Sequence, residues 1–181
     1  MLKLDIGGGA YPRGNGFLNV DILPCADIRH DINQTPWPFD DQSVDEVYSS
    51  HCVEHVSSFV GFIREVARIC KIGASAELRC PDSMSDMAMC PGHTHVISVN
   101  CVRHASEIFL ESHWKDSRRM LSLVGISAIP DDYWFPMARS SRLFNGWTNE
   151  EIMMWIPRTR HENRFCFIVT ETPQHIFEGR G

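Results

Sequence analysis

The sequence lacks the features that mark membrane proteins, secreted proteins and zinc ribbons. No apolar run approaches the roughly 18 residues that cross a bilayer. A charge at Asp5 and the glycines after it interrupt the start, where a secretory signal needs an apolar stretch. The seven cysteines are odd in number and form no CxxC pair. Free thiols in such number fit a reducing compartment, so we expect a cytoplasmic protein with no membrane partner and no metal, and we assign no site to the cysteines.

Positive charge is also scarce in this chain. There are 17 Lys and Arg residues against 23 Asp and Glu residues, which gives a formal net charge of −6 at pH 7. Non-specific binding of nucleic acid depends on cations that neutralise phosphates, so we expect no bulk nucleic-acid partner. With 181 residues, an ordinary apolar share of 43% and no internal repeat, the chain is expected to form one domain, residues 1–181.

Short apolar runs that end at turn residues predict a series of strands. They lie at residues 2–6, 17–22, 26–32, 45–49, 76–80, 125–129 and 165–170. Between the third and the fourth run, Pro36 and Pro38 exclude the interior of a helix.

Helical spacing follows Ser58, which is a good N-cap residue. Apolar residues recur there at the positions that share one helix face, namely Phe59, Phe62, Ile63, Val66 and Cys70. Gly73 is expected to end this helix, and Glu65 and Arg68 are spaced to pair on its solvent face.

More helices are expected in the second half of the chain. One would begin after Ser98 and run to about residue 114, and residues 118–124 also have helical character. Thr148 and Glu151 form a capping box for a short further helix. Strands interleaved with helices predict an α/β protein with a buried, mostly parallel sheet. Ligands bind beyond the carboxyl ends of such strands, so the residues that follow the early strands are candidates for a site.

Glycines and carboxylates stand at these strand ends. Gly7, Gly8 and Gly9 follow the first strand, where glycine lets the backbone approach a ligand and amide groups can bind an anion. Asp21 follows the second strand, where a nucleotide-type ligand presents its ribose hydroxyls, and Asp31 follows the third, where a carboxylate suits an exocyclic amine. A simple glycine turn and solvated or capping aspartates are the alternatives.

In their order and spacing, these motifs resemble those of class I S-adenosylmethionine-dependent methyltransferases, in particular a small methyltransferase type 11-like subgroup. The resemblance covers about residues 2–82. The matching blocks are residues 4–9 (LDIGGG), 19–21 (NVD), 36–45 (PWPFDDQSVD), 49–56 (SSHCVEHV), 62–68 (FIREVAR), 71–73 (KIG) and 81–82 (PD), with a weaker similarity at 92–95 (GHTH).

The resemblance implies S-adenosylmethionine as the cofactor and assigns residues to it. Asp21 would bind the ribose hydroxyls, Asp31 and the backbone at Ile32 would face the adenine, and His51 would lie near the sulfonium. The complete implied set is Asp5, Gly7, Gly8, Gly9, Asp21, Ile22, Asp31, Ile32 and His51.

The fold that the resemblance implies is Rossmann-like. It is a mostly parallel twisted sheet with helices on both faces and an antiparallel last strand. Residues 1–82 would form the cofactor-binding half, and residues 83–181 the acceptor-site lid and the closing strands. The first crossover, residues 10–16, is too short for the long helix that the family usually places there, so we expect the fold to be trimmed at this point.

Histidines are the candidates for proton transfer, because an oxygen or nitrogen acceptor often needs a general base that titrates near neutral pH. We assign this role to His51, His55 and His93, and contact with the substrate to Asp82 and His95. A surface or hydrogen-bonded role is the alternative for any single histidine.

Two alternatives to the methyltransferase remain open. Residues 51–55 (HCVEH) fit the H-x-x-E-H pattern of inverted zinc peptidases, in which His51 and His55 on one helix bind zinc and Glu54 is the general base. His93 or His95 would add a ligand. The other alternative is a methyltransferase-like binding module without catalysis, which only the short first crossover favours.

The acceptor that the resemblance favours is a small molecule or a sugar, in line with the negative net charge. Aromatic residues of the second half either cover the acceptor or form core or homodimer contacts; they are Trp114, Tyr133, Trp134, Phe135, Trp147 and Trp155. Arginines there either face an anionic substrate or lie on the solvated surface; they are Arg139, Arg142, Arg158, Arg160 and Arg164.

Overall fold

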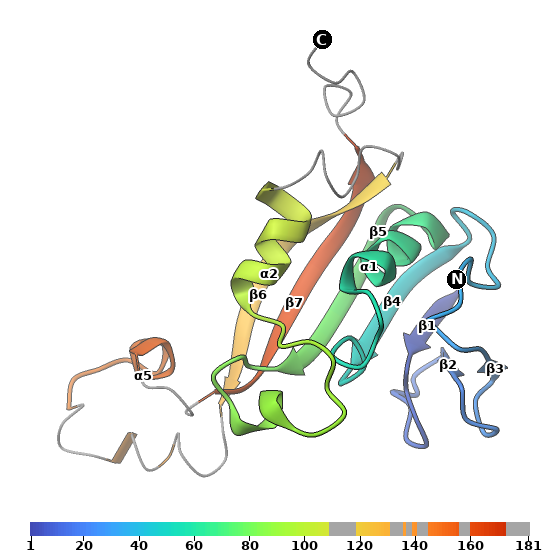
Figure 1. Ribbon diagram of the computed structural model, residues 1–181. Helices are drawn as coiled ribbons and strands as arrows, with labels where there is room; N and C mark the ends of the chain where they lie inside the picture. The colour runs from blue at the N-terminus through green and yellow to red at the C-terminus, as the bar shows by residue number, and fades with distance from the viewer. Residues whose placement is uncertain (109–118, 131–135, 137–138, 141–144, 156–159, 173–181) are drawn as a thin grey trace.

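Seven strands form a single sheet in the computed structural model, which describes residues 1–108, 119–130, 136, 139–140, 145–155 and 160–172. The spatial order of the strands is β3-β2-β1-β4-β5-β7-β6 (Figure 1). Their bounds are β1 (Lys3–Ile6), β2 (Phe17–Asp21), β3 (Ile28–Arg29), β4 (Val44–Ser50), β5 (Cys70–Pro81), β6 (Arg119–Pro130) and β7 (Arg160–Glu171).

Helical segments are short by comparison. They are α1 (Phe59–Ile69), the single turn η1 (Asp86–Met89), α2 (Val99–Arg103), its continuation η2 (His104–Ile108) and α5 (Asn149–Trp155). Within the described ranges, no helix is both long enough and apolar enough to cross a membrane.

The pairing of the strands confirms the Rossmann-like α/β sheet that was predicted. Strands β1 to β5 pair in parallel, and β7 runs antiparallel to both of its neighbours, β5 and β6. Strands β2 and β3 are added in turn on one side of β1, and β4 is then added on its other side. The strand order therefore reverses between β1 and β4, and open α/β sheets bind their ligands at such a point.

Helix α1 begins where the sequence predicts and ends earlier. The hydroxyl of Ser58 accepts a hydrogen bond from the N–H of Gly61 at 3.0 Å, which confirms it as the N-cap. The predicted stop at Gly73 is wrong, because the backbone already becomes extended at Cys70 (ψ 145) and continues as β5 through the glycine.

In the second half of the chain, the helix caps predicted at Ser98 and Thr148 are confirmed, and one predicted helix is wrong. Ser98 caps α2, and Thr148 and Glu151 exchange the two hydrogen bonds of the predicted capping box at 2.7 and 3.1 Å. Of the helix predicted at residues 118–124, residues 119–124 form instead the start of β6, and residue 118 lies outside the described residues. Pairing with β7 satisfies backbone groups of this strand and buries Leu121, so tertiary contacts override the local helix preference.

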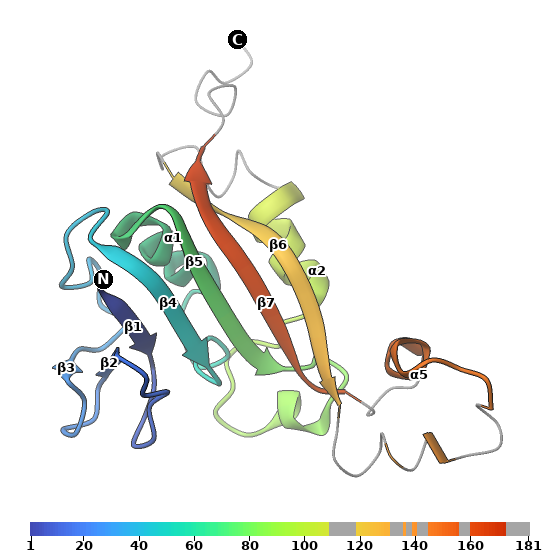
Figure 2. The same ribbon diagram turned by 180° about the vertical axis from the view of Figure 1, so that it is seen from behind.

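The trimming expected at the first crossover extends to three connections. The segments β1–β2, β2–β3 and β3–β4 contain no helix. Helices α1 and α2 lie on the same face of the sheet (Figure 1), and Figure 2 shows the opposite face of β4, β5 and β7 without a helix over it in the described part of the chain. The helical layer that was expected on this second face is therefore not seen among the described residues.

The strands themselves are built for this one-sided arrangement. In β5, alternate side chains are buried on the helix-covered face, and those between them remain partly or fully exposed; the two sets are Ala76, Leu78 and Cys80 against Ser75, Glu77 and Arg79. A sheet that carries helices on both faces has nearly continuous apolar strands, whereas alternation is typical of a sheet with one wet face.

Charged residues occupy the open face of the sheet. The carboxylate of Glu77 accepts hydrogen bonds from Arg79 at 2.8 Å and from Arg164 at 2.7 Å, and it lies 3.8 Å from Arg13. The guanidinium of Arg13 also lies over the ring of Tyr48, 4.0 Å from its centroid. Together β4, β5, β7 and the first crossover thus form a polar network where a helical layer was expected.

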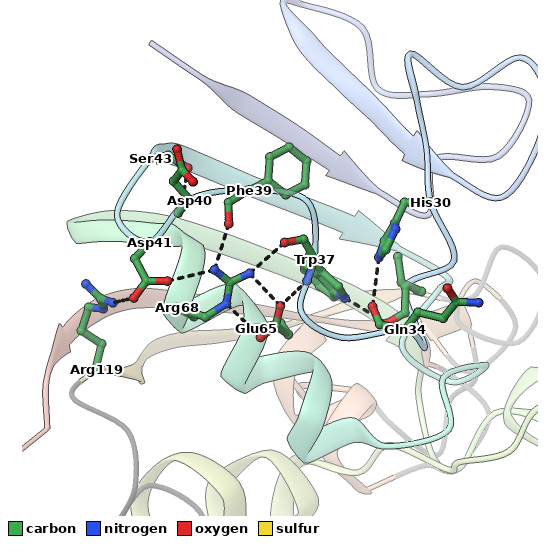
Figure 3. A network of polar contacts seen from close by, with 11 residues as sticks. His30, Gln34, Trp37, Phe39, Asp40, Asp41, Ser43, Glu65, Arg68 and Arg119 are labelled. Atoms are coloured by element: carbon green, nitrogen blue, oxygen red, sulfur yellow. Dashed lines mark hydrogen bonds and ion pairs between the residues drawn. The ribbon is translucent and has the colours of Figure 1, made fainter.

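A clamp on α1 holds the long connection between β3 and β4 (Figure 3). Glu65 accepts a hydrogen bond from the N–H of Trp37 at 2.7 Å and pairs with Arg68 through both of its oxygens, at 2.9 and 3.0 Å. The expectation that Glu65 and Arg68 pair is confirmed. The expected solvent face is wrong for Glu65, which is 9% exposed because the connection covers it.

Arg68 extends the clamp to the rest of this connection. Its guanidinium donates to the carbonyls of Trp37 and Phe39 and to the carboxylate of Asp41, at 3.0, 2.9 and 2.9 Å. The indole N–H of Trp37 donates to the carbonyl of Ile32 at 2.9 Å. The clamp therefore fixes the position of the residues that follow β3 directly.

Candidate functional site

A cavity of about 280 Å³ lies at the carboxyl ends of β1, β2 and β4. This is close to the lower end of the range for small-molecule pockets, roughly 300–1,000 Å³. Its lining combines residues from four successive strand ends; they are Gly7, Asp21, Ile22, His30, Asp31, Ile32, Asn33, His51, Cys52, His55 and Val56. The cavity lies where the strand order reverses, between β1 and β4.

Gly7 must be glycine for two reasons. Its φ of +74° lies in the left-handed region, and a Cβ placed there would overlap the side chain of Cys52. The N–H of Gly7 donates to the carbonyl of Val20 at 2.8 Å. The backbone at the end of β1 therefore lies directly against both β2 and the segment after β4.

Asp5 packs beneath the backbone of the glycine loop, on the side away from solvent, and does not line the cavity. Its side chain is buried and accepts a hydrogen bond from the N–H of Arg13 at 2.6 Å. Burial raises the pKa of Asp5 above its ordinary value, although Arg13 opposes the shift. A Cβ on Gly8 would lie 2.6 Å from Asp5 Oδ2 and 2.7 Å from Asn19 Oδ1, so the loop leaves no room for a larger residue there.

Asp21 reaches the cavity from the end of β2. One carboxylate oxygen accepts a hydrogen bond from the N–H of Gly9 at 2.9 Å, and the other accepts one from the N–H of Leu23 at 2.9 Å. Each carboxylate oxygen has a second lone pair, so both can accept a further hydrogen bond from a ligand. Ile22 lines the cavity next to it.

Asp31 and Ile32 form the wall that follows β3. The carboxylate of Asp31 accepts a hydrogen bond from the N–H of Asn33 at 3.0 Å, which makes the tight turn that aspartate favours. The carbonyl of Ile32 is held by Trp37, so the clamp on α1 fixes this wall.

His51 occupies a strained position at the end of β4. Its φ is +51°, which is uncommon for a residue with a side chain. Its Nε2 lies 2.8 Å from Glu162 Oε2, and its Nδ1 lies 3.4 Å from Glu54 Oε1. The hydrogen bond to Glu162, with a smaller effect from Glu54, raises the pKa of His51 to about 9. The ring is therefore a cation at neutral pH, which disfavours it as a general base.

The other predicted catalytic and substrate residues divide between two places. His55 lines the main cavity, and its ring packs edge-on against that of His93 with centroids 4.7 Å apart. His93 and His95 line a separate small cavity beside it. Asp82 lines neither; it is buried and accepts hydrogen bonds from Asn163 at 2.9 Å and from the N–H of Met84 at 2.8 Å.

Four lining residues were missed from the sequence: His30, Asn33, Cys52 and Val56. All four directly neighbour residues that were singled out or lie one turn from them, so their closeness to the strand ends was the available signal. The expectation that no cysteine marks a site is wrong for Cys52. Burial raises the pKa of this thiol to about 12, so it is a neutral wall residue.

Part of the predicted acceptor region lies outside the described residues, namely Trp114, Tyr133, Trp134, Phe135, Arg142 and Arg158, as do the side chains of Trp155 and Arg160. Trp147 is partly exposed, and Arg139 is exposed. Arg164 pairs with Glu77 on the open face of the sheet, and so lies in a structural network.

The geometry does not support the zinc-peptidase alternative. That reading needs residues 51–55 on a continuous helix, but they form a bend and turns after β4. The Nε2 atom of His51 is engaged by Glu162. Without a helix at residues 51–55, His51 and His55 do not share the helix face that the zinc-peptidase pattern requires.

Comparisons with known proteins agree with this fold. Residues 15–78 match the family model of a methyltransferase domain. No curated protein sequence matches the chain.

Several solved methyltransferases share the fold. An S-adenosylmethionine-dependent methyltransferase from Archaeoglobus fulgidus has a TM-score of 0.62 at 16% identity, over 92% of this chain and 85% of its own. A methyltransferase in complex with the Trm112 activator of Haloferax volcanii has a TM-score of 0.60 at 20% identity, over 92% and 81%. Geranyl diphosphate C-methyltransferase from Streptomyces coelicolor A3(2), solved with S-adenosyl-L-homocysteine, has a TM-score of 0.56 at 14% identity, over 92% and 73%.

The family match at residues 15–78 and the shared fold agree with the resemblance to class I S-adenosylmethionine-dependent methyltransferases.

Proposed function

We propose that this chain binds S-adenosylmethionine in the cavity at the ends of β1, β2 and β4 and methylates a small-molecule or sugar-type acceptor. One observation carries the proposal. Gly7, Asp21, Asp31 and His51 come from four different strand ends, and all four line this one cavity. A sheet that served only as a scaffold would not require these four residues to line one cavity.

The groups in the cavity fit the parts of the cofactor. Asp21 has lone pairs available for two ribose hydroxyls, and the apolar side chains of Ile22 and Ile32 suit the faces of an adenine ring. Asp31 lies where the exocyclic amine of adenine would be recognised, and Gly7 leaves room for the methionine part. When bound, the cofactor supplies an electrophilic methyl group on a sulfonium, and the protein supplies position and electrostatics.

The histidines take different roles in this proposal. His51 is a cation held between Glu162 and Glu54, so it forms a fixed wall of the cavity and does not remove a proton. His55 lines the same cavity and His93 packs on it, so these two are the candidates for the general base as long as their ring nitrogens are not bound to a metal. Asp82 and His95 remain candidates for contact with the acceptor.

The acceptor is proposed from the character of the chain. A net charge of −6 disfavours a polyanionic substrate. One structural neighbour was solved with geranyl diphosphate, a small molecule, and another with a protein activator.

The proposal also includes the domain organisation, the cellular location and the oligomeric state of this chain. Residues 1–82 form the cofactor-binding half of a single domain. All seven cysteines are free thiols, which supports a reducing, cytoplasmic location. The exposed Trp147 leaves a homodimer contact as one use of the second half.

Calorimetric titration with S-adenosyl-L-homocysteine tests the proposal. We expect saturable binding of one ligand per chain, and no comparable binding of NAD, which has the same adenosine but no homocysteine part. An absence of heat at high micromolar ligand would remove the methyltransferase function.

The non-catalytic alternative predicts the same binding but no transfer. Because three crossovers lack helices, it retains a structural argument. Incubation with S-adenosylmethionine labelled on the methyl group and a panel of sugars and small hydroxylated or amino compounds separates the two. Formation of S-adenosyl-L-homocysteine that depends on an added acceptor supports the enzyme.

A further inference from the structure

The carboxylate of Glu54 is buried without the partners that such a group needs. The side chain is 1% exposed, and neither oxygen takes part in a hydrogen bond within the described part of the chain. The nearest cation is His51, whose Nδ1 lies 3.4 Å from Oε1. Burying a carboxylate with unfilled lone pairs costs free energy unless a cation or a donor compensates it.

Two histidines face this carboxylate. Glu54, His55 and His93 each present one ligand atom, and the three atoms lie within 4.8 Å of one another. The Nδ1 atom of His93 is buried and has no hydrogen-bond partner among the described residues. The cluster therefore combines a buried carboxylate that accepts no hydrogen bond, and whose Oε1 faces the His51 ring, with a buried ring nitrogen that has no hydrogen-bond partner among the described residues.

The ring of His55 is already oriented for binding. Its Nδ1 lies 3.1 Å from the carbonyl of Gly92. A carbonyl only accepts hydrogen bonds, so in the neutral ring Nδ1 carries the proton and Nε2 has a free lone pair. Histidines that bind metals are held in the same way, with the second ring nitrogen donating to a carbonyl or a carboxylate.

The backbone joins the two loops that carry the cluster. The carbonyl of Glu54 accepts hydrogen bonds from the N–H groups of Thr94 and His95, at 2.8 and 3.1 Å. The hydroxyl of Thr94 donates to the carbonyl of Val56 at 2.8 Å. The loop after β4 and the segment of residues 92–95 are thus held together before any ligand arrives.

We propose that Glu54, His55 and His93 bind one divalent transition-metal ion of the zinc class. Two imidazole nitrogens and one carboxylate oxygen suit zinc and disfavour magnesium and calcium, which prefer oxygen ligands alone. His95 lies beside the cluster in the same small cavity, with its Nε2 unpaired among the described residues, and a water or His95 fills the fourth position.

The geometry needs a small adjustment to close around the ion. Ligand atoms on a tetrahedral zinc, each at about 2.0–2.1 Å from the metal, lie about 3.4 Å from one another. The atoms of this cluster must therefore move together by up to about 1.4 Å, which rotation of the histidine rings supplies.

This site differs from that of the zinc-peptidase reading. Glu54 is here a ligand and not the base, and His51 is excluded because Glu162 engages it. The metal would join the loop after β4 to the segment of residues 92–95 next to the wall of the main cavity, to which His55 also belongs.

Metal titration of chelator-treated, tag-free protein tests the proposal without the cofactor. We expect one zinc per chain by calorimetry and elemental analysis, and one cobalt that gives the visible spectrum of a four-coordinate site. His93→Ala and Glu54→Gln should each weaken zinc binding by more than about 100-fold, since loss of even an outer partner costs 10–100-fold. Zinc should raise the Tm of the unaltered chain and not that of His93→Ala.

His104→Ala is the matched control, because His104 is an exposed histidine at the start of η2 and is not one of the three residues of the cluster. It should bind zinc like the unaltered chain. Absence of stoichiometric binding, or equal affinity in the His93 and His104 variants, would overturn the site. If Glu54→Gln does not fold, His93→Ala, at a partly exposed position, decides alone. Titration of each variant with S-adenosyl-L-homocysteine keeps the outcome separate from that of the proposed function.

Discussion

The carboxylate of Asp21 accepts a hydrogen bond from the backbone N–H of Gly9 at 2.9 Å. This contact joins the end of β2 to the glycine loop that follows β1, across a crossover that contains no helix. In the proposed complex the same carboxylate also binds the ribose. Loop position and ribose recognition thus depend on one side chain, which makes Asp21 the best residue for separating them.

Asp21→Asn should weaken the binding of S-adenosyl-L-homocysteine by about 10- to 100-fold. The amide oxygen can still accept from Gly9, but the hydrogen bond from Leu23 is lost. The charge that strengthens the hydrogen bonds to ribose is also lost, and a hydrogen bond to a charged group contributes about 1.5–3 kcal/mol. Calorimetry measures the affinity, and the Tm should fall only slightly because the lost bond to Leu23 is exposed. Asp40→Asn, which removes an exposed carboxylate outside the cavity, is the control. Equal affinity in both variants would show that the ribose assignment is wrong.

Arg68→Met should destabilise the chain and weaken the cofactor site together. It leaves the Glu65 carboxylate without its cation and the connection between β3 and β4 without its clamp. We expect a loss of about 2 kcal/mol, which lowers the Tm by about 4–8 °C for a chain of this size. Thermal unfolding measures the first effect, and titration with S-adenosyl-L-homocysteine measures the second.

Lys71→Met is the control for this change. It removes an exposed ion pair with Asp45, and solvent screens such pairs so that they contribute little to stability. If the two variants unfolded at the same temperature, the clamp would have no special role.

The sequence predicted the fold of residues 1–82 well because its signals are local. Ser58 as a cap, the strands around Asp21 and the glycines after β1 each follow from a few neighbouring residues, and the family resemblance supplied their order. The double role of Asp21, as both loop anchor and cavity wall, involves two strand ends that are not neighbours in the sequence.

Errors arose where distant parts of the chain decide the outcome. Residues 119–124 form a strand because β7 pairs with them, although their local pattern is helical. Glu65 is buried because the connection that carries Trp37 folds over it. His51 is held as a cation by Glu162, which is 111 positions away in the chain. Pairing of this kind cannot be read from spacing along a single sequence.

The open face of the sheet could have been predicted. The alternation of small or apolar with polar residues in β5, from Ala74 to Cys80, is typical of a sheet that is covered on one side only. The short connections of the first half point the same way, since a crossover helix needs more residues than they contain. The interleaving of strands with helices predicts a buried sheet instead, and the family resemblance implies helices on both faces.

Glu77→Gln tests whether the charges on this open face stabilise the fold. Glu77 pairs with Arg79 and Arg164 and lies near Arg13, so its neutralisation removes the carboxylate that these three guanidinium groups share and leaves Arg79 with Glu162 at 3.6 Å. Because the network is partly solvated, we expect a loss of only about 1 kcal/mol, measured as a lower urea midpoint. Glu46→Gln removes the same charge from a pair with a single lysine, Lys3, and should cost less than half as much. At 1 M salt, where charges are screened beyond about 3 Å, the difference between the variants should shrink. Equal midpoints at low salt would mean that the alternating pattern, and not the ion network, is what keeps this face of the sheet open to water.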